Sequence, residues 1–157
     1  VEPHYIRWVK NKFGEKIYKA KVEKKQVLSW EIASKIGHVL TFSIRRLQRV
    51  IGDRWFGGEA LGKTGTTNDS RTCWFCGSTP EYTTSVYIGS DDNRTLGEQV
   101  YASKVSFPIW FYFHKKCDLK PKKFSYDPLL KSVEVNWKNG QIVNKEINMQ
   151  DVVPLLI

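Results

Sequence analysis

The chain has 157 residues and a formal net charge of +9, and 41% of its residues are hydrophobic while 26% are charged. This length suits one domain, and the hydrophobic content excludes a disordered chain, which would lack the apolar surface to offset chain entropy. No apolar run approaches the length of a membrane-spanning helix, and three cysteines are too few for a disulfide-built scaffold. The basic residues show no zinc-finger spacing, RNP motif or basic heptad arm, so they indicate a solvated basic surface without a nucleic-acid partner.

The first third of the chain predicts a hairpin followed by a long helix. Two short apolar runs between residues 5 and 22 flank a turn at residues 11–14, which is typical of a β-hairpin. Ser29 is placed to cap a helix that ends at Gly52. Its apolar residues recur every three or four positions and predict one buried stripe of Ile32, Ile36, Val39, Leu40, Ile44, Leu47 and Ile51.

The remaining two thirds predict a sheet, a second helix and a second hairpin. Three short β-prone runs, at residues 63–67, 73–77 and 83–88, are separated by turn residues and predict an antiparallel meander. Residues 97–116 favour a helix with Pro108 either in a first turn or at a break. Asn139-Gly140 predicts a hairpin between residues 133–137 and 141–143. The order of elements predicts an α+β fold in which antiparallel strands are flanked by helices.

The segment 57–64 satisfies the phosphate-binding pattern of two glycines four residues apart followed by Lys-Thr. Such a loop needs a buried strand before it and a helix after it, because the helix N-terminus supplies N–H groups to the phosphates. Here an amphipathic helix precedes the segment and turn residues follow it. A nucleotide site is therefore the weakest of the alternatives.

Cys73 and Cys76 have the spacing of a metal or redox pair. A metal site would need further ligands, for which His114 and Cys117 are available at irregular spacing. On a strand, positions three apart point to opposite faces, which is awkward for one metal ion or one disulfide. We therefore favour small buried core residues at both positions.

Lys63-Thr64-Gly65 places a cation, a hydroxyl and a residue without a side chain in a row on a predicted strand. A glycine lets a substrate backbone approach the strand closely, and Lys63 with the hydroxyls of Thr64 and Thr66 suits capture of a carboxylate. The alternative is an edge strand whose Lys63 prevents aggregation.

A longer set of motifs resembles the transpeptidase domain of penicillin-binding proteins, most closely the bifunctional class that also carries a glycosyltransferase domain. The matching strings are GKTGTTND at residues 62–69, WFxGxTPE at 74–81, VYIGxDD at 86–92 and FPIW at 107–110. The resemblance runs from about residue 6 to residue 113. It implies a β-lactamase/transpeptidase-like α+β fold, present as a partial domain, with residues 1–117 as the C-terminal portion of that domain and 118–157 as a tail with a hairpin.

The family carries three active-site motifs, Ser-x-x-Lys, Ser-x-Asn and Lys-Thr-Gly. Only the third is present here, and the nearest approach to the first is Ser43-Ile44-Arg45-Arg46. In the family the other two motifs precede Lys-Thr-Gly, so we expect a chain that starts after them and is inactive alone. The departures from the family pattern include the two cysteines and the residues at 54–56, which put acceptor preference in doubt.

The resemblance also implies roles for the matching residues. Lys63 and Thr66 would be catalytic, Lys63 through its charge and Thr66 through a backbone N–H in the oxyanion hole. Thr64, Gly65, Thr66 and Thr67 would bind substrate, with two of the hydroxyls on its carboxylate. No cofactor and no metal are implied.

The implied function is acyl transfer from D-Ala-D-Ala stem peptides of peptidoglycan to a neighbouring amine, with β-lactams as inhibitors. The implied partners are the stem peptides and the N-terminal remainder of the same transpeptidase, and the implied location is the periplasm, anchored through sequence outside this chain. The alternatives are a non-catalytic binding or scaffold module, a β-lactamase-like hydrolase and the nucleotide-binding protein. A partial domain would expose faces meant for its missing part, so we expect aggregation or partial unfolding in isolation.

Overall fold

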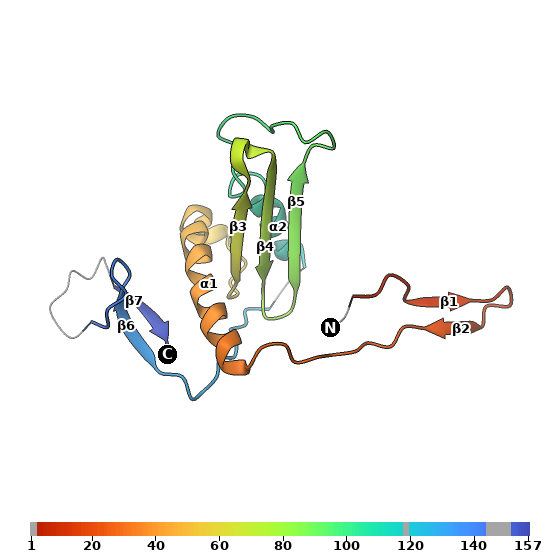
Figure 1. The fold of residues 1–157 in the computed structure, drawn as a ribbon, viewed down its shortest axis with the longest axis horizontal. Helices are drawn as coiled ribbons and strands as arrows, with labels where there is room; N and C mark the ends of the chain where they lie inside the picture. The colour runs from red at the N-terminus through yellow and green to blue at the C-terminus, as the bar shows by residue number, and fades with distance from the viewer. Residues whose placement is uncertain (1–2, 118–119, 144–151) are drawn as a thin grey trace.

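The structure, a computed structural model, describes residues 3–117, 120–143 and 152–157. Within them, two α-helices accompany a three-stranded antiparallel sheet and two separate two-stranded pairs (Figure 1). The pairs are β1 (Trp8–Lys10) with β2 (Lys16–Lys19), and β6 (Ser132–Asn136) with β7 (Val152–Leu156). The sheet has the order β3 (Leu61–Thr66), β4 (Thr72–Ser78), β5 (Thr83–Gly89), and the helices are α1 (Trp30–Ile51) and α2 (Ser106–Lys116). The predicted N-terminal hairpin and meander are confirmed.

Helix α1 begins and ends where its capping residues predict. The Ser29 hydroxyl accepts a hydrogen bond from the Ile32 N–H at 3.2 Å, and Glu31 pairs with Lys35 one turn on at 2.6 Å. At the other end Gly52 takes a φ of +61°, a left-handed conformation that glycine adopts without strain, and its N–H bonds the Gln48 carbonyl.

The buried face of α1 differs from the predicted stripe. Ile32, Ile36 and Val39 are each about half exposed, and the buried positions are instead Ser34, Gly37, Thr41 and Ile44. This face packs against β3 and the returning chain: a Cβ on Gly37 would meet the side chains of Leu61 and Tyr126 at 3.5 and 3.8 Å, which is ordinary contact. Only the C-terminal part of the predicted stripe, from Ile44 on, joins the hydrophobic core.

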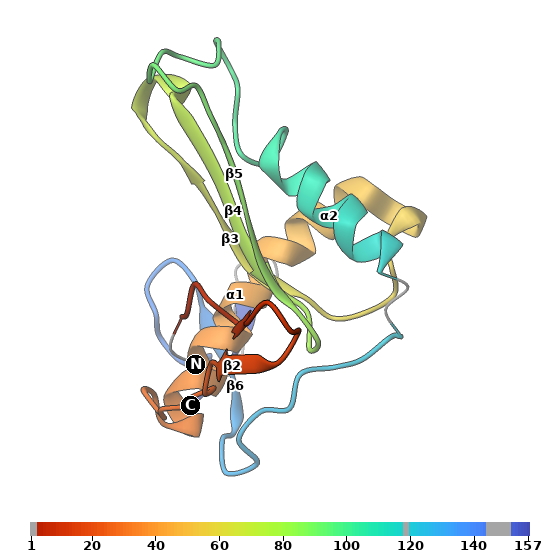
Figure 2. The same cartoon turned by 90° about the vertical axis from the view of Figure 1, so that its right-hand side faces the viewer.

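The core lies between one face of the sheet and α2. It is formed by Ile44, Ala60, Phe75, Phe107, Trp110 and Phe111. Figure 2 shows α2 along one face of the sheet. The opposite face, which carries Trp74 and Tyr87 with ring centroids 4.9 Å apart, is exposed.

Helix α2 is shorter than predicted, because residues 97–105 form a loop. Gly97 and Gln99 have φ values of +119° and +54°, which a right-handed helix does not accommodate. Hydrogen bonds to β3 and to the turn after it hold this loop: the Ala102 N–H donates to the Thr66 hydroxyl at 3.1 Å, and the N–H of Leu96, just before the loop, donates to the Ser70 carbonyl at 3.0 Å. Pro108 does lie in the first turn of α2, where its missing N–H costs nothing.

The C-terminal hairpin is confirmed only in part. Gly140 makes the turn with a φ of +72°, and residues 141–143 meet β6 through a single bridge, Val135 to Ile142. The regular partner of β6 is β7, which the sequence did not predict. Between these strands and α2, the chain returns along α1, where the Asp127 N–H donates to the Ser34 hydroxyl at 2.9 Å.

Neither described helix combines the length and apolar character that a bilayer crossing requires.

Candidate functional site

The candidate site is the free edge of β3. This strand pairs with β4 on one side only, and α1 runs along its other side (Figure 1). The Ser43 hydroxyl of α1 donates to the Gly62 carbonyl, which joins the helix to the start of the strand. Beyond that contact, Thr64 and Thr66 of β3 border a groove.

The backbone of β3 directs alternate groups toward this edge. The Thr67 N–H bonds the Thr72 carbonyl across the β3–β4 turn at 3.1 Å, and the Gly62 carbonyl points the other way, toward α1. Since successive residues of a strand alternate in direction, the N–H groups of Thr64 and Thr66 point away from β4 to the free edge. Thr66 therefore presents a backbone donor at the free edge.

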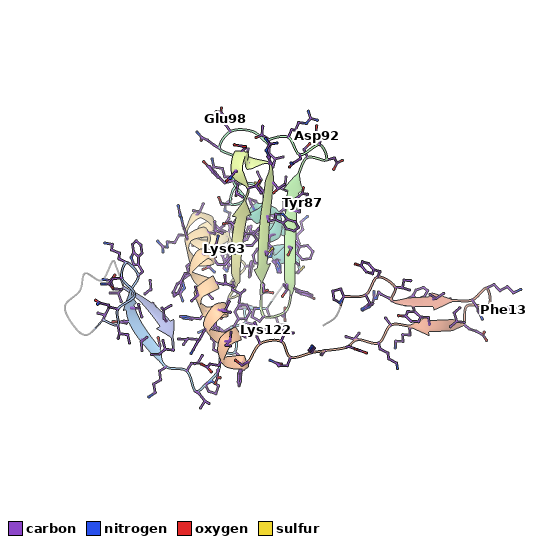
Figure 3. The ribbon with its side chains drawn as sticks, viewed as in Figure 1. Phe13, Lys63, Tyr87, Asp92, Glu98 and Lys122 are labelled. Carbon is purple, nitrogen blue, oxygen red and sulfur yellow. The ribbon has the colours of Figure 1, made fainter. Side chains whose placement is uncertain are left out.

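Register with β4 distributes the predicted site residues over both faces of the sheet. Lys63 and Gly65 lie opposite Cys76 and Trp74 on the exposed face, while Thr64 and Thr66 lie on the face of the core. Lys63 lies on β3 (Figure 3), and its ammonium donates to the Thr64 carbonyl at 2.9 Å. The cation is thus at the edge, next to the two threonines.

Two glycines of this strand differ in what they allow. A Cβ on Gly62 would lie 2.8 Å from the Cys76 carbonyl oxygen and 2.9 Å from the Phe75 ring, so packing requires a glycine there. A Cβ on Gly65 would meet only the Trp74 Cβ, at an ordinary 3.5 Å. Packing within the described residues therefore does not explain why residue 65 is a glycine. A glycine of this kind is expected where a ligand approaches the backbone of the strand.

The groove beside Thr64 and Thr66 has a volume of about 660 Å³. Its floor is β3, one wall is α1 and the other is the loop before α2. The residues that line it are Phe42, Ser43, Arg46, Leu47, Val50, Thr64, Thr66, Tyr101, Ser103 and Lys104. Two of these are cationic and none is acidic, so the groove suits an anionic ligand with some apolar surface.

Thr66 also positions the loop wall of the groove. Its hydroxyl accepts the Ala102 N–H at 3.1 Å, between the lining residues Tyr101 and Ser103. The proton of that hydroxyl remains available for a further acceptor. The hydroxyl of Thr67, in contrast, accepts the Thr72 N–H at 2.9 Å and closes the β3–β4 turn.

The other candidate sites are not assembled. Lys63 and Thr64 lie within strand β3 and no helix follows them, so the phosphate-loop geometry is absent from this segment. Cys73 is buried, which confirms it as a core residue. Cys76 is exposed on the opposite face, so the expectation that it is also a buried core residue is wrong. No group of three or more His, Cys, Asp or Glu side chains among the described residues could hold a metal ion.

Sequence reasoning missed both cations of the groove. In the sequence Arg46 only occupies the place of the lysine of a nucleophile motif, and Lys104 falls within the helix predicted at residues 97–116. Ser43, at the start of the same four residues, bonds the Gly62 carbonyl and packs against β3. The available signal is spacing: Arg46 lies three positions after Ser43 and four before Val50, which places these groove residues on one side of α1.

Comparison with known proteins gives a consistent picture. No family model matches the chain. Penicillin-binding protein 1A of Rickettsia bellii is 37% identical over 103 residues, which are 64% of this chain and 12% of that protein. The proteins of the same name from Neisseria flavescens and Pseudomonas aeruginosa are 41% identical over 97 residues and 50% identical over 55 residues, or 59% and 35% of this chain. The chain spans only 12% and 7% of the length of those two relatives.

The fold has a solved counterpart. The crystal structure of penicillin-binding protein 1A from Haemophilus influenzae matches 99% of this chain and 29% of its own chain, with a TM-score of 0.71 and 22% sequence identity. At that sequence identity the match shows the fold alone. It confirms the expected transpeptidase-like α+β arrangement as a partial domain.

Proposed function

Since the chain is related to penicillin-binding protein 1A and corresponds to part of the transpeptidase domain, we propose that it supplies the substrate-binding strand of a peptidoglycan D-Ala-D-Ala transpeptidase. In this reaction a serine oxygen attacks the carbonyl of the penultimate D-Ala, an ester forms, and the terminal D-Ala leaves. A neighbouring amine then attacks the ester, forms the new peptide bond and releases the serine. β-Lactams would occupy the same strand in place of the stem peptide.

The free edge of β3 is the observation that carries this proposal. Thr64 and Thr66 lie on one face beside a groove without acidic residues, and the Lys63 ammonium lies at the same edge. The two hydroxyls and the cation would hold the terminal carboxylate of the stem peptide, and Gly65 would let its backbone lie along the strand. The outward N–H of Thr66 would be one donor of the oxyanion hole, a contribution worth on the order of 10²–10³ in rate.

This chain would bind substrate without being acylated. No serine in the sequence begins a Ser-x-x-Lys or Ser-x-Asn motif, and Ser43, the nearest approach, is bonded to the Gly62 carbonyl. The nucleophile and its base would come from the part of the transpeptidase that precedes Lys-Thr-Gly in the family. That larger protein would work in the periplasm, where peptidoglycan lies, held at the inner membrane by sequence outside this chain.

The test is an NMR titration of the isotopically labelled chain with acetyl-D-Ala-D-Ala. We expect weak, millimolar binding with amide shifts concentrated at residues 63–67, and weaker binding in a Thr64→Val, Thr66→Val double variant. The matched control ligand is the C-terminal amide of the same peptide, which lacks the carboxylate and should leave these amides unchanged. Fluorescent penicillin should not label the chain covalently. Covalent labelling, or shifts that avoid β3, would contradict the proposal.

A further inference from the structure

We propose that the groove beside β3 recognises a second anionic group on its ligand, and that Arg46 and Lys104 are the residues that select it. This inference rests on the proposed function, because it takes the groove as the place where the stem peptide lies. It goes further in naming a substrate class: acylated D-Ala-D-Ala peptides that carry an additional carboxylate away from their C-terminus.

The first support is the charge of the groove. Arg46 comes from α1 and Lys104 from the loop before α2, so cations stand on both walls of one space. None of the described residues that line this space is acidic. Like charges that share a partly enclosed region raise its potential, and an anion that enters would lower the energy of both.

The second support is that Arg46 has no partner of its own. Within residues 3–117, 120–143 and 152–157 its side chain makes no hydrogen bond and no ion pair, and the residue is exposed at the groove. The adjacent Arg45 is instead held over the Phe42 ring, 4.8 Å from the centroid. A planar guanidinium without a partner presents two parallel donors, which match the two oxygens of a carboxylate.

Lys104 is held at the groove by neutral groups. Its ammonium donates to the Gln99 carbonyl at 3.3 Å and lies 5.5 Å from the centroid of the Tyr101 ring, which also lines the groove. Neither contact neutralises the positive charge. The bond between the Ala102 N–H and the Thr66 hydroxyl fixes this part of the loop beside β3.

The third support is size. A volume of about 660 Å³ is within the range of small-molecule sites and far exceeds what one carboxylate fills. The proposed function already assigns one carboxylate to Lys63, Thr64 and Thr66 on the strand. Arg46 and Lys104 then remain for a second acidic group in the same ligand.

The experiment compares acetyl-D-Ala-D-Ala with succinyl-D-Ala-D-Ala, whose acyl group carries an additional carboxymethyl group and therefore one more carboxylate at the N-terminal end. Binding to the labelled chain is measured by NMR titration at low salt and in about 0.5 M salt. We expect the succinyl peptide to bind about fivefold more tightly at low salt, the size of one partly exposed ion pair, and this preference to fall at high salt. An Arg46→Gln, Lys104→Gln double variant should lose the preference while it keeps its affinity for the acetyl peptide.

The matched control is Arg49→Gln, which removes the same charge from α1 at a residue that does not line the groove and should keep the preference. If both peptides shift residues 63–67 equally, the inference is overturned and the proposed function stands. If the preference survives in the double variant, Arg46 and Lys104 are not its source and the inference fails. If neither peptide shifts β3, both proposals fail.

Discussion

Strand β3 contains two glycines in different surroundings, one buried at Gly62 and one exposed at Gly65. Gly62 lies opposite Gly77 of β4, and a Cβ at either position would come within 3.0 Å of the Phe75 ring. Gly65 lies two residues beyond Lys63, opposite Trp74, and among the described residues only the Trp74 Cβ would come within 4 Å of a Cβ there. Lys-Thr-Gly thus contains a glycine that packing does not need, which sequence spacing alone could not reveal.

Gly62→Ala and Gly65→Ala form a matched pair that tests this difference. We expect Gly62→Ala to lower the free energy of unfolding by about 1–3 kcal/mol, because the added methyl group meets a backbone carbonyl and a core ring. Gly65→Ala should change stability little and should weaken acetyl-D-Ala-D-Ala binding. Urea denaturation and NMR titration measure the two effects. Equal destabilisation by both substitutions would show that packing requires Gly65 as well.

At the scale of elements, the sequence predicted what local chemistry decides. The meander follows from alternating residues between turn residues, and α1 follows from Ser29, Gly52 and the spacing between them. The loop at residues 97–105 could not be predicted in this way, because the hydrogen bonds that attach Leu96 and Ala102 go to Ser70 and Thr66, which are distant in sequence. The groove was missed for the same reason, since its cations meet only after α1 and this loop have packed on either side of β3.

Thr66→Val should loosen the loop before α2. Valine has the shape of threonine without the hydroxyl, so the Ala102 N–H loses its acceptor at a cost of about 1 kcal/mol. We expect faster amide hydrogen exchange at Ala102 and its neighbours. Thr64→Val is the control, because Thr64 lines the same groove and has no side-chain hydrogen bond to the loop among the described residues. Unchanged exchange at Ala102 in Thr66→Val would contradict this role.

At the scale of the whole molecule, large apolar side chains remain exposed on several elements. They include Ile32, Ile36 and Val39 on α1, Trp74 and Tyr87 on the open face of the sheet, and Trp8 and Phe13 in the N-terminal hairpin. This exposure agrees with the expectation that the isolated chain associates or partly unfolds. That expectation stays a prediction, which light scattering over a range of protein concentrations tests.

Stability of the whole chain should depend on pH through His114. This side chain of α2 is fully buried and makes a hydrogen bond of 2.8 Å with the Thr84 hydroxyl of β5, and burial lowers the pKa of its imidazole below the ordinary value of about 6.5. Below pH 6.5 the unfolded chain therefore binds more protons than the folded one. The free energy of unfolding is then highest above that pH and falls as the pH drops toward the lowered pKa, by at most about 1.4 kcal/mol per pH unit.

Urea denaturation between pH 7.5 and pH 5.5 measures this dependence. His114→Gln keeps a polar group near Thr84 but does not titrate, so its stability should vary less with pH. His4→Gln alters an exposed residue outside the core and should retain the dependence of the original chain. Burial also lowers the pKa of His38, with Arg45 adding to the effect, so some dependence should persist in His114→Gln. If the free energy of unfolding of His114→Gln varied with pH as much as that of the original chain, His114 would not be a source of the pH dependence.

The hydroxyl of Thr66 links two events that are otherwise separate. It accepts the Ala102 N–H, and its own proton points to no partner among the described residues. A hydroxyl that accepts one hydrogen bond becomes a stronger donor for the next, so the loop contact and a bond to an entering acceptor strengthen each other. By thermodynamic reciprocity, whatever favours the ordered loop also favours the occupied groove, and occupation in turn orders the loop. Through this one side chain, the affinity of β3 for its ligand and the order of the loop at residues 97–105 become coupled.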